Sequence, residues 1–144
     1  MEKQPQFPFA PKDFARCLNA TCPRSQNCLR RTAALQDTDE HLFLKVVNPL
    51  RYPKEGEECE LFRSTDKVWM AWGVTHLLDN VPYKEGSLLR NMIINHLGRS
   101  QYYRCFRKER PFSPQDQQTI RLLFRQRGIS EEPSFDYYTN EFNW

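Results

Sequence analysis

Four of the five cysteines in this chain are spaced in a way that is typical of metal ligands. Cys17, Cys22 and Cys28 form a C-x4-C-x5-C segment. Cys59 follows after thirty further residues, in a segment rich in turn-forming residues. Because closed structural zinc sites are tetrahedral and favour thiolates, three clustered cysteines require a fourth ligand. The spacing predicts a structural zinc site closed by Cys59, or by His41 in its place.

Two other interpretations of the cysteines remain open at this point. The Cys22-Pro23 step also occurs beside iron–sulfur clusters, which are held by thiolates as well. Alternatively no cofactor is bound, and the reduced thiols pack as small apolar side chains. In each case we expect the cysteines to tie the N-terminal arm to the rest of the protein. Cys105 lies in a segment of different character, and we expect it to be a free thiol.

The sequence favours a non-enzymatic protein, although it does not decide the matter. The five glycines form no phosphate-binding loop, and neither a G-x-S-x-G nor an H-E-x-x-H motif is present. The three histidines are scattered along the chain. We therefore assign no catalytic residue and expect an interaction or regulatory protein.

The charge distribution suggests a second functional surface. Residues 86–128 carry nine basic and two acidic side chains, whereas residues 129–144 carry four acidic and no basic ones. Arginines interleaved with aromatic rings are typical of single-stranded nucleic-acid binding, and they also suit a protein partner. Within the basic aromatic segment 99–127, the predicted contacts are Arg99, Tyr102, Tyr103, Arg104, Arg107, Lys108, Arg121 and Arg125. Alternatively, the arginines pair with the acidic tail or face water.

The expected elements place these residues on a mixed fold. The apolar, β-branched run 41–47 predicts a strand, and residues 68–78 fit either a helix or a strand. Apolar spacing predicts a helix that follows Ser87 and ends at Gly98. Ser113-Pro114-Gln115-Asp116 is a strong helix start.

The aromatic tail from Phe135 to Phe142 predicts one or two final helical turns. These elements predict an α+β protein, with a small metal-clipped N-terminal loop and strand region packed on two or three C-terminal helices. We expect one domain over residues 1–144, with a cysteine-containing arm and small sheet in 1–63 and a mainly helical part in 64–144.

Nothing in the sequence resembles a targeting segment. The N-terminus lacks an apolar core and a small-residue cleavage site, and no apolar run approaches the length of a membrane span. We therefore expect a cytoplasmic protein without a membrane partner. Cytoplasmic thiols are kept reduced, which favours metal ligation over disulfides.

Several motifs together resemble a known family. They are the C-x4-C-x5-C segment followed by Leu29-Arg30, then Cys59-Glu-Leu-Phe, Gly98-Arg-Ser-Gln-Tyr-Tyr-Arg, Ser113-Pro-Gln-Asp-Gln-Gln, and Phe135-Asp-Tyr-Tyr before Trp144. The chain resembles an uncharacterised bacterial domain family of unknown function over nearly its whole length. This resemblance implies no activity, cofactor or residue role, but it implies that residues 1–144 form one complete unit.

Overall fold

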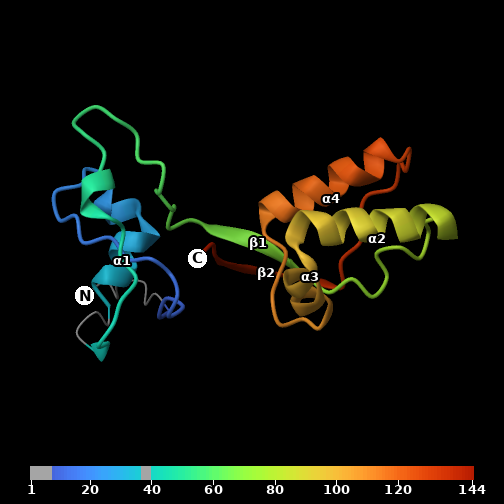
Figure 1. The fold of residues 1–144 in the computed structure, drawn as a ribbon, viewed down its shortest axis with the longest axis horizontal. Helices are drawn as coiled ribbons and strands as arrows, with labels where there is room; N and C mark the ends of the chain where they lie inside the picture. Colours follow the sequence, from blue (N-terminus) through green and yellow to red (C-terminus); the bar gives the residue numbers. More distant parts are fainter. Residues whose placement is uncertain (1–7, 37–39) are drawn as a thin grey trace, which may run out of the picture. The chain divides into compact units, whose positions relative to one another are not determined.

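The computed structural model describes residues 8–36 and 40–144, which form two compact units (Figure 1). The first unit comprises the chain up to Asp66 together with residues 142–144, and the second comprises Lys67–Glu141. Helices combine with a two-stranded antiparallel sheet, so the predicted α+β class is confirmed.

The first unit is built around one short helix. This helix, α1, runs over Leu29–Ala34, and two 3-10 turns, η1 (Ser25–Asn27) and η3 (Pro49–Arg51), lie in the loops on either side. Its apolar cluster consists of Ala10, Phe14, Leu29 and Ala33, with Phe142 and Trp144 packed against them. The unit is therefore held together by side chains from the arm, from α1 and from residues 142–144.

The strand predicted over residues 41–47 is wrong. Only Val46 pairs, in an isolated parallel bridge with Arg16. Leu42 and Phe43 are 96% and 89% exposed, so this apolar run finds no neighbouring strand and buries little surface. A strand is stable only when a partner completes its hydrogen-bond ladder. The small sheet expected within residues 1–63 is likewise replaced, in the described part of that region, by single bridges.

The sheet belongs to β1 (Lys67–Trp72) and β2 (Tyr137–Phe142). Residues 68–78 were predicted to form either a helix or a strand. The strand is correct for the first part of this range, up to Trp72. The helical turns predicted for the tail are wrong, because β2 pairs with β1. The Trp72 Nε1 donates a hydrogen bond of 2.7 Å to the Thr139 Oγ1, and the rings of Trp72 and Tyr137 stack with centroids 6.0 Å apart. These cross-strand contacts outweigh the weak helical spacing of the tail.

Three helices complete the second unit: α2 (Tyr83–Leu97), α3 (Arg99–Phe106) and α4 (Pro114–Gln126). Helix α2 packs against both α3 and α4, and α4 packs against β1 (Figure 1). Their buried cluster consists of Ala71, Leu77, Leu89, Ile93, Tyr102, Cys105, Phe112, Ile120 and Phe124. Helix α2 begins at Tyr83, earlier than the predicted Ser87, and it ends as predicted before Gly98.

The predicted start of α4 is confirmed in detail. The Asp116 backbone N–H donates to the Ser113 hydroxyl oxygen at 3.1 Å, and the Ser113 backbone N–H donates to the Asp116 carboxylate at 3.2 Å. This reciprocal pair is a capping box, and Pro114 occupies the first turn, where its missing N–H costs nothing.

Candidate functional site

The cysteines of the first unit lie on three different segments. Cys17 follows the arm, and its backbone N–H donates to the Arg30 carbonyl oxygen at 3.0 Å. Cys28 is the N-cap of α1, is buried, and forms a bridge with Ser64. Cys59 is half-buried and opens a turn in which its carbonyl oxygen accepts a 3.3 Å bond from the Phe62 backbone N–H.

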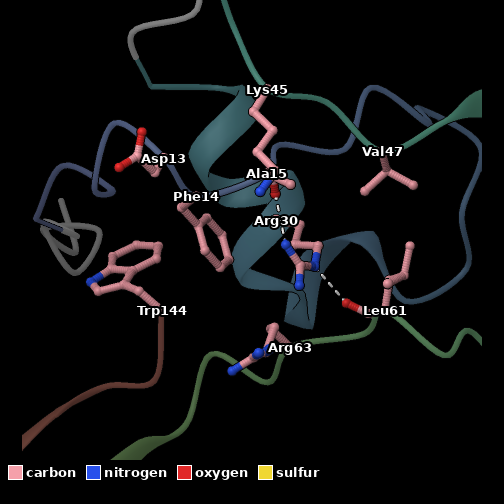
Figure 2. Close-up of a pocket in the computed structure, with 9 residues that line it drawn as sticks. All are labelled: Asp13, Phe14, Ala15, Arg30, Lys45, Val47, Leu61, Arg63 and Trp144. Atoms are coloured by element: carbon pink, nitrogen blue, oxygen red, sulfur yellow. Dashed lines mark hydrogen bonds between the residues drawn. The ribbon is translucent and has the colours of Figure 1, made fainter. Parts of the chain in front are cut away.

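The Arg30 side chain links these segments. Its Nε donates to the Leu61 carbonyl oxygen at 2.7 Å, and its Nη1 donates to the Ala15 carbonyl oxygen at 3.0 Å (Figure 2). One guanidinium on α1 thus binds the backbone that precedes Cys17 and the backbone that follows Cys59.

Three of the thiols contribute to the electrostatic surroundings of Arg30. Burial and the like charge of Arg63 lower the pKa of the Arg30 guanidinium. The thiols of Cys28, Cys59 and Cys17, when ionised, raise this pKa. Three of the four predicted ligands thus lie close enough to Arg30 to affect its pKa, although Cys59 is far from the other two in the sequence.

The described arrangement is not a closed metal site. Across residues 8–36 and 40–144, no group of three or more His, Cys, Asp and Glu side chains is arranged to hold a metal ion. Cys22 lies in the turn that leads into η1, where its carbonyl oxygen accepts from the Ser25 backbone N–H at 3.1 Å. The alternative ligand His41 is half-buried. A single ion would require the thiols to draw closer together than they are in this structure.

A pocket of about 390 Å³ opens beside Arg30 (Figure 2). It is lined by Asp13, Phe14, Ala15, Arg30, Lys45, Val47, Leu61, Arg63 and Trp144. The Phe14 and Trp144 rings meet edge to face with centroids 5.3 Å apart. Sequence reasoning missed this pocket, because its lining comes from five separate segments and no short motif connects them.

Several cations of the basic aromatic segment are paired within the second unit. The Arg121 Nε lies 2.6 Å from the Glu132 carboxylate, and the Arg125 Nη2 lies 3.6 Å from it. The Lys108 Nζ lies 3.2 Å from the Asp136 carboxylate. The acidic residues that follow α4 therefore neutralise three of the predicted contact residues.

The remaining predicted contacts divide between the core and the surface of α3. Tyr102 is buried in the core, which raises the pKa of its hydroxyl. Arg107 pairs with Glu109 at 2.9 Å. Arg99 lies over the exposed Tyr103 ring, 5.7 Å from its centroid.

Arg104 donates to the Gln101 side-chain oxygen at 3.5 Å. Phe106 is 54% exposed. Arg99, Tyr103 and Phe106 thus form an exposed patch on α3, which we call the α3 patch. Cys105, on the same helix, is buried and free, as predicted, and burial raises the pKa of its thiol.

Within the described residues, no helix combines the length and apolar character needed to cross a bilayer. Searches among curated proteins and among solved structures find no match to the chain. A family whose members have no assigned function matches from the first residue to the last. The chain belongs to this family of unknown function, DUF6078, over residues 1–144.

Proposed function

We propose that this chain is a non-enzymatic interaction or regulatory protein whose cysteines have a structural role in the first unit. The observation that carries the proposal is the position of Arg30. It binds the backbone of two distant segments and has three thiols, from Cys17, Cys28 and Cys59, as electrostatic neighbours. An arrangement of this kind holds the arm, α1 and the Leu61 segment together.

The proposal extends to a Cys-ligated zinc ion held by Cys17, Cys22, Cys28 and Cys59. A zinc ion with four thiolates carries a net negative charge, which Arg24 and Arg31, in and beside the cysteine loop, would offset. Because the described thiols do not form a closed site, this extension requires them to converge when the metal binds. An iron–sulfur cluster is the alternative cofactor, and it is held by the same kind of ligand.

Elemental analysis and a visible spectrum of protein purified without oxygen test the extension. We expect one equivalent of zinc, no colour, and loss of the metal with a lower melting temperature in Cys22→Ser. Cys105→Ala is the matched control, because Cys105 lies in the second unit, and it should retain the metal.

If the protein contains iron and is brown, the cofactor is an iron–sulfur cluster and not a zinc ion. Protein without metal, together with an unchanged melting temperature in Cys22→Ser, would contradict a metal role for the cysteines. Destabilisation in Arg30→Gln would still support the structural role of this site, since that variant loses the two backbone contacts directly.

Nucleic-acid binding by the basic aromatic segment is the second candidate function. It is favoured by the α3 patch, where Arg99 lies over Tyr103 and Phe106 is exposed nearby. A labelled single-stranded oligonucleotide should bind at low salt, weaken steeply as salt rises, and bind less well to Tyr103→Ala. Tyr83→Ala is the control, because Tyr83 is exposed but lies on α2. If the oligonucleotide does not bind even at low salt, nucleic-acid binding by this segment is excluded.

A further inference from the structure

We propose that the pocket beside Arg30 binds a small aromatic phosphomonoester. The pocket combines cationic side chains with an aromatic wall, within a volume of about 390 Å³. This volume lies in the range of small-molecule sites, which are largely apolar and contain a few convergent polar groups. The inference goes beyond the structural role of the cysteines and does not depend on a metal.

The first argument is an excess of positive charge. Arg30, Lys45 and Arg63 line the pocket, and among the described lining residues Asp13 is the one with an acidic side chain. Among the described residues, none of the three cations lies within ion-pair distance of a carboxylate. The described side chains of the lining, three cations and one carboxylate, thus carry a net charge of about +2 at neutral pH. A dianion would balance this charge.

The second argument is that the Arg30 side chain is already held in a fixed position at the pocket. Two backbone carbonyls fix its Nε and Nη1, and its guanidinium lies over the Phe14 ring, 4.8 Å from the centroid. Figure 2 shows the third nitrogen of the guanidinium on the side where Arg63 lies. A guanidinium held in this way loses little freedom when its remaining N–H groups bind an anion.

The third argument is the proximity of two like charges. Arg30 and Arg63 both line the pocket, so two guanidinium groups share its wall (Figure 2). The Arg63 Nη1 makes one long hydrogen bond, 3.4 Å, to the Asn143 carbonyl oxygen. An anion between the two guanidiniums would turn this repulsion into two charge-assisted contacts.

The shape of the ligand follows from the remaining lining. Phe14 and Trp144 meet edge to face, and Val47 and Leu61 add apolar surface. A flat ring fits such a wall, since aromatic pairs favour stacked or edge-to-face contacts. A phosphomonoester carries between about −1.5 and −2 charges at pH 7, and its oxygens match the guanidinium fork. A carboxylate carries half of the charge that the pocket needs.

Isothermal titration calorimetry with phenyl phosphate tests the proposal. We expect one saturable site with a dissociation constant below about 1 mM. Arg63→Gln and Lys45→Gln should each weaken binding about tenfold, because each removes one charge-assisted contact. Lys54→Gln is the matched control: it removes an exposed cation of the same unit outside the pocket, and it should leave binding unchanged.

Two further ligands separate the parts of the recognition. Inorganic phosphate has the charge without the ring, and benzoate has the ring with a single charge; both should bind at least about fivefold more weakly than phenyl phosphate. Equal binding of either ligand overturns the proposed ligand class. No saturable binding of phenyl phosphate, or unchanged binding in both pocket variants, overturns the site. Melting curves and metal content of each variant distinguish this failure from loss of fold or of the proposed zinc.

Discussion

The backbone of Gly73 and the carboxylate of Asp136 lie in direct contact in the second unit. A Cβ at residue 73 would overlap the Oδ2 and Cγ of Asp136, and Gly73 has a φ of +78°, where side chains are strained. The same carboxylate accepts bonds of 3.1 Å from the Thr75 backbone N–H and 2.6 Å from the Thr75 hydroxyl. The absence of a side chain at residue 73 is therefore required for the Asp136 contacts that precede β2.

Gly73→Ala should lower the free energy of unfolding of the second unit by at least about 2 kcal/mol, because strain and overlap add. Chemical denaturation followed by circular dichroism measures this change. Gly128→Ala is the control, since Gly128 has a similar φ of +75° but no atom near its would-be Cβ. It should cost about 1 kcal/mol. Equal losses in the two variants would show that Asp136 is not displaced.

Asp136→Asn should reduce stability and remove part of its acid dependence. The hydrogen bond from the Thr75 side chain lowers the pKa of Asp136, and Lys108 adds to this effect. Because the folded pKa is depressed, the carboxylate stabilises the protein above its unfolded pKa of about 3.9, and this stability is lost as the pH falls through the folded value.

At pH 7 we expect Asp136→Asn to cost about 1–3 kcal/mol, with a shallower loss of stability below about pH 4 than in the original protein. Urea titrations at several pH values measure both effects. Glu131→Gln, at an exposed position nearby, should follow the original pH profile. An unchanged profile in Asp136→Asn would contradict the assignment.

Ser113→Ala should cost about 1 kcal/mol, because it removes the hydroxyl that accepts the Asp116 backbone N–H. Thermal unfolding measures the difference, and Ser130→Ala at an exposed position serves as the control. A loss near zero would mean that water replaces the cap without cost.

Glu132→Gln should change stability by less than about 1 kcal/mol, because its pairs with Arg121 and Arg125 are largely exposed. The variant should nevertheless elute from a heparin column at higher salt, since two cations lose their counter-charge. Glu131→Gln changes the net charge equally without touching either arginine. If the two variants elute together, the pairing does not control polyanion binding.

Local signals in the sequence were the most informative. The helix start at Ser113 and Asp116 was predictable because a capping box is made by residues three apart, whose contacts need no other element. The end of α2 before Gly98 was predictable for the same reason. The sequence also indicated that acidic residues in 129–144 were available to pair with basic ones, but not that Glu132 would serve two arginines.

Contacts between distant segments could not be predicted. Residues 41–47 have the composition of a strand, but strand formation depends on a partner, and only Val46 finds one. The spacing of aromatic residues in the tail weakly favoured a helix. The sequence did not show that β1 pairs with this segment, which forms β2. The grouping of Cys17, Cys22, Cys28 and Cys59 at one metal stays a prediction, whereas Arg30 and the pocket beside it had no signal in the local sequence.

The packing of Trp144 against Phe14 has a consequence for biosynthesis. The chain leaves the ribosome from its N-terminus, and domains generally fold as units during synthesis. The second unit, Lys67–Glu141, is contained in one continuous stretch of chain. The first unit lacks Phe142 and Trp144 until translation has passed them. The first unit is therefore synthesised first but completed last. Its arm and cysteines cannot pack fully until residues 142–144 have been synthesised.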